Sequence, residues 1–254
     1  MFGEVHSLTA RGLDGVGGVR FAQSISIIDD TRKFSLWPDR GHRLAFGLYA
    51  QETLRTGVPA PDHRHGLTAS ASWVHIWPLA HQHTLASRIE LTMMVPLVGR
   101  PEFRSLVRAG GVDGLGAYGG NELFGRGVAL AQLEYRHMFW SNFNVNLVHL
   151  FWLRGIGGTL FTGAASVSPC DTLRGWFGKE SWYGQVGYGV TAFLQLLGVT
   201  PQFIRFDVAV PLVRRRSTCL DEVLPDYLAE YQGVAPGEFQ LPRVGVNLTF
   251  LQPF

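Results

Sequence analysis

The sequence predicts an all-β fold, namely an antiparallel transmembrane β-barrel with about 8–10 strands in this chain. Three observations support this prediction. The final segment, 243–254, alternates large apolar residues with small or polar ones, as a strand between lipid and a hydrated lumen requires. No window reaches the roughly 18 consecutive apolar residues of a membrane-spanning helix. The 31 glycines, with 12% aromatic and 17% charged residues, suit closely packed strands with interfacial aromatic rings.

The final segment has the features of the closing strand of an outer-membrane barrel. Its apolar row, with an aromatic residue at the end, consists of Val244, Val246, Leu248, Phe250 and Phe254. Gln252 interrupts this row. An edge strand of a soluble sandwich has the same alternation, so this stretch alone leaves both interpretations open.

The first two strands are predicted at 19–28 and from Leu44 to Leu48, joined by a polar turn with proline and glycine. Strands at 67–77 and 85–95 follow, joined by a short turn. In the second of these, Arg88 and Glu90 point away from the apolar row. These charges indicate a wet or salt-bridged lumen, although cross-strand charge pairs in a soluble barrel have the same pattern.

The remaining strands follow a long stretch rich in glycine. A strand around residues 131–139 places Glu134 and Arg136 opposite its apolar row. Two long strands at 182–196 and 204–210 follow, and the second places Arg205 and Asp207 inward. Together with a strand that contains 160–164, this gives nine expected strands and a possible tenth within residues 1–11, each near the roughly 9–11 residues of a tilted spanning strand.

Charge and cysteine content exclude several classes of partner and site. The net charge is +2 and no basic stripe occurs, so nucleic acid is not an expected partner. The run 214–216 is interpreted as a solvated loop edge or one that faces anionic lipid head groups. Cys170 and Cys219 each lie in a polar loop, which fits a disulfide better than a metal site. Residues 1–12 show no secretion signal, so the numbering is expected to describe a mature chain or an excised segment.

Several motifs occur in the order found in one known family. A turn of the form D-x-R followed by P-x-x-G is formed by Asp30, Arg32, Pro38 and Gly41. A glycine-rich loop follows, with Gly119, Gly120, Arg126 and Gly127. The strand after it contains Glu134-Tyr135-Arg136, and a later strand reads 205–212 with an inward aspartate and a Pro-Leu ending. From about residue 18 to its end the chain resembles the bacterial surface antigen superfamily, the BamA/TamA-type outer-membrane assembly barrels, in the C-terminal part of the barrel.

Two departures from this family concern its loop arginine. Arg126 and Gly127 match the family's R-G only if one residue is inserted. In the family the loop arginine pairs with an aspartate of an F-x-D-x-G strand, and Thr162 occupies that aspartate position here. An arginine that still enters the lumen would need another acid, for which Glu134, Glu90 and Asp207 are candidates. The alternative is that the loop no longer fills the barrel.

The resemblance implies a location, a topology and a domain organisation. A bacterial barrel ends in the periplasm, so the turn at 30–41 is expected there and the long loops outside the cell. We expect a single barrel domain over 1–254, without periplasmic domains. It would have an N-terminal segment or extra strand at 1–17, a glycine-rich extracellular or lumenal loop at 98–127 and an extracellular loop at 213–240. The sheet would close alone or be completed by another copy or chain.

The resemblance also implies a function in the outer membrane of a Gram-negative bacterium. The first hypothesis is a protein that acts in insertion or translocation of proteins. The alternative is a structural or pore-forming, porin-like barrel without insertase activity, alone or as a subunit of a larger membrane complex. Expected partners are outer-membrane lipids and lipopolysaccharide, client barrel proteins, another copy of the chain or other outer-membrane subunits.

No enzymatic, metal or cofactor chemistry is expected. The pairs His63/His65 and His81/His83 would lie on opposite sides of the membrane in the predicted topology, so they cannot share a metal ion. The sequence contains no G-x-S-x-G elbow, Walker loop or dinucleotide fingerprint. We therefore expect a protein that is not an enzyme.

Overall fold

The computed structural model describes residues 2–6, 11–12, 18–32, 38–55, 62–99, 105–120, 122–147, 151–170, 172–196, 200–215 and 244–250. One large sheet contains β1 (Phe2–His6), β2 (Arg11–Gly12), β3 (Gly18–Asp30), β4 (Gly41–Arg55), β5 (Asp62–Ala80), β6 (His83–Val98), β9 (Gly127–Leu147), β10 (Phe151–Val167), β11 (Trp182–Leu196), β12 (Thr200–Pro211) and β13 (Gly245–Phe250). A small second sheet contains β7 (Val107–Arg108) and β8 (Phe124–Gly125). The 3-10 turn η2 spans Lys179–Ser181.

The prediction of an all-β, antiparallel fold is confirmed. Strands pair with their neighbours in sequence, except that β6 pairs with β9 across the segment that carries β7 and β8. Both β1 and β2 pair with β3, and β13 pairs with β12. Within the described ranges β1 and β13 do not pair, so the described sheet is open rather than a closed barrel. Over the same residues, no helix is long and apolar enough to cross a membrane.

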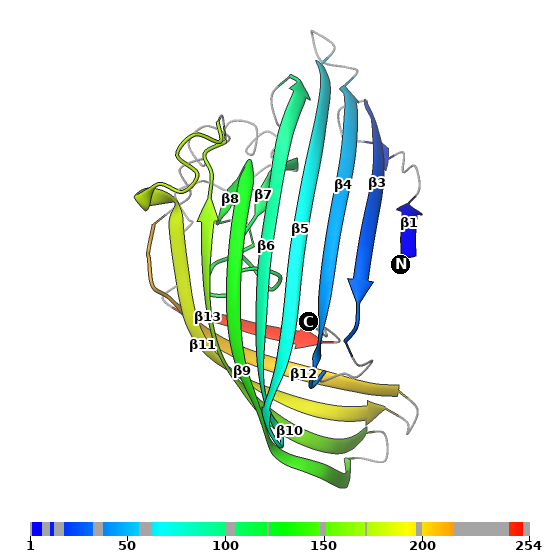
Figure 1. Ribbon diagram of the computed structural model, residues 1–254, viewed down its shortest axis with the longest axis vertical. Helices are drawn as coiled ribbons and strands as arrows, with labels where there is room; N and C mark the ends of the chain where they lie inside the picture. The colour runs from blue at the N-terminus through cyan, green and yellow to red at the C-terminus, as the bar shows by residue number, and fades with distance from the viewer. Residues whose placement is uncertain are drawn as a thin grey trace.

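The sheet is strongly curled (Figure 1). Adjacent strands lie about 4.8 Å apart, so β9 and β12, which are separated by two strands, would be about 14 Å apart in a flat sheet. Nevertheless Nη1 of Arg205 on β12 lies 3.2 Å from Oε1 of Glu134 on β9. The curl therefore brings side chains of distant strands together on one side, which we call the inner face. The opposite side is the outer face.

Alternation along the strands gives the two faces different chemistry. In β9, Glu134 and Arg136 are buried on the inner face, whereas Leu133 is exposed on the outer face. Exposed apolar side chains continue across the outer face from β3 to β13: Ile25, Ile27, Phe46, Leu48, Ile89, Leu91, Leu133, Leu160, Val186, Val190, Phe206, Val208, Val246 and Leu248. Their backbone partners are each other, as in the pairs Ile27/Phe46 and Phe206/Leu248. The outer face is thus one continuous apolar band.

The two ends of the sheet differ in their connections. Residues 31–40 and 81–82 connect strands at one end, which we call the short-turn end. At the other end, the long-loop end, the connections include 99–126 and 168–181. In the first connection, the described residues 105–120 and 122–126 fold back onto the inner face; in the second, the described residues from 172 onward fold onto the outer face, as described below.

Candidate functional site

Four charged side chains form a buried network on the inner face. Glu134 accepts a hydrogen bond from Nε of Arg136 at 2.9 Å and two from the guanidinium of Arg205 at 3.2 Å. Arg205 also donates from Nε to Asp207 at 2.8 Å. These four side chains are only 3–14% exposed, and the guanidinium of Arg205 lies over the ring of Phe161 at 5.5 Å. The network balances two arginines with two carboxylates and connects β9 to β12.

The segment 105–126, which we call the inner loop, covers this network from the long-loop end. Leu115, Ala117 and Tyr118 are at most 2% exposed, so the middle of the inner loop belongs to the core. Ala117 N–H donates to Oε1 of Gln185 at 2.8 Å. The hydroxyl of Tyr118 lies 3.0 Å from the carbonyl of Gly184, which it can reach as a donor.

Other strands hold the inner loop through its backbone carbonyls. The Gly114 carbonyl accepts from Nε2 of Gln132 on β9 at 2.6 Å. The Gly116 carbonyl accepts from Nδ2 of Asn247 on β13 at 2.9 Å. Arg88 on β6 donates to the Asp113 carbonyl at 2.9 Å. Together with the bonds to β11, these contacts attach one segment to four strands.

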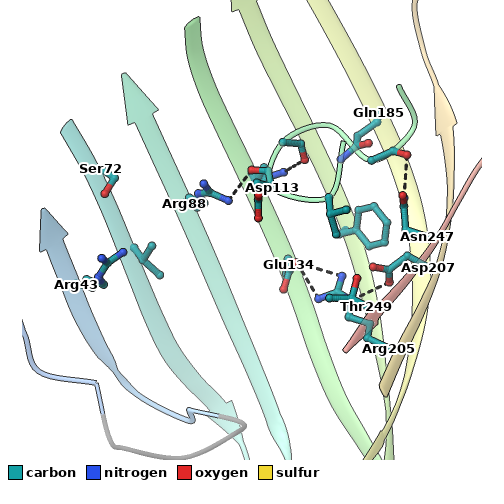
Figure 2. A pocket seen from close by; sticks show the side chains of 16 residues that line it. Arg43, Ser72, Arg88, Asp113, Glu134, Gln185, Arg205, Asp207, Asn247 and Thr249 are labelled. Carbon is teal, nitrogen blue, oxygen red and sulfur yellow. Dashed lines mark hydrogen bonds and ion pairs between the residues drawn. The ribbon is translucent and has the colours of Figure 1, made fainter. Parts of the chain in front are cut away.

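A polar cavity of about 280 Å³ remains between the inner loop and the strands. Figure 2 shows Arg43, Ser72 and Arg88 on one wall and the residues of β12 and β13 on the other, with the inner loop between them. The residues lining it include Arg43, Ser72, Arg88, Gln132, Glu134, Gln185, Arg205, Asp207, Asn247 and Thr249. The candidate site is therefore a charged cavity on the inner face that the inner loop covers.

The lumen-facing charges predicted from the sequence fall into two groups. Glu134, Arg136, Arg205 and Asp207 form the buried network described above. Arg88 pairs with Glu90 at 2.5 Å in a less buried position, with side chains 24% and 29% exposed. All six predicted residues thus lie on the inner face, and each is part of an ion pair.

The glycines of the predicted loop motif lie at the surface of the inner loop. Gly119 and Gly120 are exposed, and the Gly119 N–H donates to Glu122 at 2.7 Å. Burial raises the pKa of the Glu122 carboxyl, and this hydrogen bond partly opposes the rise. The deeply buried part of the loop is the stretch before these glycines, around Leu115 and Tyr118.

Arg126 lies where the inner loop enters β9. Its backbone carbonyl accepts from Met94 N–H at 2.6 Å, and its Nε donates to the Met94 carbonyl at 3.5 Å. The three acids considered for it have other arginine partners: Arg205 binds Glu134 and Asp207, and Arg88 binds Glu90. The hydrogen bonds described above hold the loop to the strands through its backbone and through Tyr118.

Gly127 and Thr162 both lie on the outer face. A Cβ atom at Gly127 would lie 2.8 Å from the ring of Trp176, so the glycine makes room for this indole. Thr162 is exposed, and its hydroxyl donates to the Gln185 carbonyl at 2.9 Å. Its neighbour Phe161 points inward instead. The position matched to the family's inward aspartate therefore faces outward here.

The turn motif at the short-turn end forms a compact unit. Arg32 donates to both carboxylate oxygens of Asp30, at 2.9 and 2.7 Å. Gly41 has φ of +113°, and a Cβ there would lie 2.6 Å from Cα of Arg32. Pro38 is buried. All four motif residues are described, and three of them contact one another directly or through the backbone of the turn.

The closing strand and the cysteines are described in part. Val244, Val246 and Leu248 are exposed on the outer face. The backbone of Phe250 pairs with Ile204, and Phe254 lies outside the described residues. Cys170 is buried and disulfide-bonded. Cys219 also lies outside the described residues, so this pairing stays a prediction.

Sequence reasoning assigned no role to the neutral residues that hold the inner loop. Gln132, Gln185 and Asn247 are amides that bind its backbone. The sequence does contain a signal for these amides. Each is two positions from an inward charge or a small residue of its strand, and therefore lies on the same inner face. Gln185 is 2% exposed and Gln132 and Asn247 are half-buried, so these amides need partners because an unpaired polar group in a core is costly.

Gly245 provides a test of how the inner loop contacts β13. A Cβ there would clash with the Gly116 oxygen and lie 2.6 Å from Cα of Ala117, both backbone atoms. We expect Gly245→Ala to displace the loop and to raise amide hydrogen exchange at 114–118, with an overpacking cost of about 1–3 kcal/mol. Gly120→Ala is the matched control, since its Cβ would meet no atom within 4 Å. Equal exchange in both variants would show that the loop does not pack on β13.

Comparison with protein-family models gives no match for this chain, and comparison with curated proteins gives none either. The interpretation of the site therefore depends on the geometry described above.

Proposed function

We propose that this chain forms part of a transmembrane β-barrel in a bacterial outer membrane and acts in the assembly or translocation of other membrane proteins. The observation that supports this most strongly is the apolar outer face. Large apolar side chains stay exposed there on strands from β3 to β13, whereas the ion pairs of β6, β9 and β12 lie on the inner face. Lipid outside and a polar lumen inside require this arrangement.

In this proposal the short-turn end faces the periplasm and the long-loop end the cell exterior. Short periplasmic turns and longer external loops are the usual arrangement in outer-membrane barrels. Arg32 and Asp30 then lie in a periplasmic turn, and the inner loop enters the lumen from outside.

The sheet edge supports an assembly role. In the described residues β13 has a backbone partner on one side, β12, along only six residue pairs. An unpaired edge cannot face lipid, because each open backbone group there costs several kcal/mol. A client strand that adds to this edge would satisfy those groups, as would another copy or another chain that completes the barrel.

One observation favours the second candidate, a structural or pore-forming barrel without insertase activity. The arginine and aspartate pair of the assembly family has no equivalent at Thr162, which faces outward. The inner loop, however, occupies the lumen through contacts to β6, β9, β11 and β13. This filling does not favour a wide, permanently open pore.

Reconstitution separates the two candidates. Liposomes that contain this protein should fold a small client barrel faster than empty liposomes if it acts in assembly, and should show little ion leakage. Liposomes that leak ions without faster client folding would support the pore. Copurification with a fixed partner would identify a subunit of a larger complex, and a protein that stays folded and monomeric without detergent would contradict the membrane assignment.

A further inference from the structure

Residues 172–182, which we call the outer flap, fold onto the outer face at the long-loop end. Two hydrogen bonds hold the flap to β10: Nε1 of Trp176 donates to the Ser166 carbonyl at 3.0 Å, and the Ser166 hydroxyl donates to the Trp176 carbonyl at 2.5 Å. The indole fills the space left by Gly127 on β9. The flap is thus fixed over the face that would contact lipid.

The flap exposes aromatic rings at this position. The rings of Trp176 and Phe177 stack at 5.1 Å, and Phe177 lies 6.2 Å from the ring of Trp182. Phe177 is 60% exposed and Trp182 is 43% exposed. Exposed aromatic residues at one end of an apolar band are typical of a membrane interface.

An apolar groove of about 430 Å³ begins at Trp176 and crosses the outer face. Small residues of β5, Ala69 and Ala71, lie between larger residues of the adjacent strands. The larger residues along the groove are Ile25, Ile27, Phe46, Leu48, Leu91 and Met93. Its surface is almost entirely apolar, which suits a hydrocarbon chain.

Basic side chains gather at the same end of the groove. Arg174 and Lys179 are exposed in the flap, and Arg214 is exposed at the end of β12. Arg215 donates to the carbonyls of Lys179 and Glu180, which places 214–215 beside the flap. Among the described residues of the flap, 172–182, the acid is Glu180, so this described cluster is basic overall and complements an anionic head group.

We propose that the groove and this basic cluster together bind the lipid A part of lipopolysaccharide. An acyl chain occupies the groove from Trp176 to Ala71, and the phosphates contact Arg174, Lys179 and Arg214. This inference rests on the proposed function, because it requires the long-loop end to face the outer leaflet. It adds a specific lipid site on the outer face, separate from the lumen.

The test measures binding of purified hexa-acylated, bisphosphorylated lipid A to the full chain in detergent, by native mass spectrometry and by the shift of the unfolding temperature. The variant Arg174→Gln/Lys179→Gln/Arg214→Gln should bind roughly tenfold to hundredfold more weakly, since each basic residue near an anionic surface contributes appreciably. Ala69→Leu/Ala71→Leu should also weaken binding by filling the groove. Arg40→Gln, at the short-turn end, and Ala131→Leu, on the outer face away from the groove, are the matched controls.

Changes in the lipid test the site independently of protein folding. Dephosphorylated lipid A and phosphatidylglycerol should bind more weakly than intact lipid A to the unaltered chain. Equal binding of all three lipids, or equal binding by the triple variant and Arg40→Gln, would overturn the site. A chain that inserts into membranes but does not select lipid A would disprove this site alone, whereas a chain that needs no detergent would disprove the proposed function.

Discussion

Replacing Glu134 with alanine is expected to lower the free energy of unfolding by about 3–5 kcal/mol, the usual cost of removing one member of a buried ion pair. Glu134 is 5% exposed and accepts hydrogen bonds from both Arg136 and Arg205. Its loss leaves two guanidinium groups in the core with one carboxylate, Asp207. Urea titration of the protein in lipid vesicles, followed by tryptophan fluorescence, measures the change.

The matched control is Glu90→Ala, which removes a carboxylate from the same inner face. Glu90 and its partner Arg88 are 29% and 24% exposed, and ion pairs with access to water contribute at most about 1 kcal/mol. Similar losses in the free energy of unfolding for the two variants would mean that water reaches the Glu134 network, and that the inner loop does not exclude water from it.

The variant Val208→Arg is expected to destabilise the protein in lipid vesicles by about 2–4 kcal/mol, the cost of an arginine near the middle of the lipid-facing surface of a barrel. Val208 lies in the outer row of β12 and is 38% exposed. The same urea titration in lipid vesicles measures the change in the free energy of unfolding.

Leu212→Arg is the control at the rim. Leu212 directly follows β12 and is 64% exposed, and near the interface an arginine costs only about 0–1 kcal/mol. The difference in destabilisation between the two variants tests the membrane assignment. In a soluble protein both positions would be exposed to water, and both would tolerate arginine equally well.

The sheet was predictable from the sequence because alternation reports which side chains of a strand face inward and which face outward. In β11, Val186 and Val190 are exposed while Tyr183 and Gln185 are buried, as the alternation indicates. Strand ends were less predictable. The strand predicted around 131–139 extends over Gly127–Leu147 as β9. Its last part alternates Phe143, Val145 and Leu147 with three asparagines, a residue type that is depleted in strands.

Pairing within the site was less predictable than orientation. The inward direction of Glu134 and Arg205 follows from the alternation of side chains along a strand. Their contact, however, depends on how strongly the sheet curls between β9 and β12. Thr162 shows the opposite problem. A motif match placed it at an inward position, yet a shift of one residue reverses the face of a strand residue, and here Phe161 is the inward one.

The contact between Arg205 and Glu134 has a consequence for the order of folding. The two residues are 71 positions apart in the chain, and β10 and β11 lie between their strands in the sheet. Contacts at such long sequence separation form slowly, because chain closure precedes any gain from the contact. We therefore expect the ion network to complete late, and a chain stalled before that step to expose unmatched arginine and carboxylate groups inside a half-formed sheet.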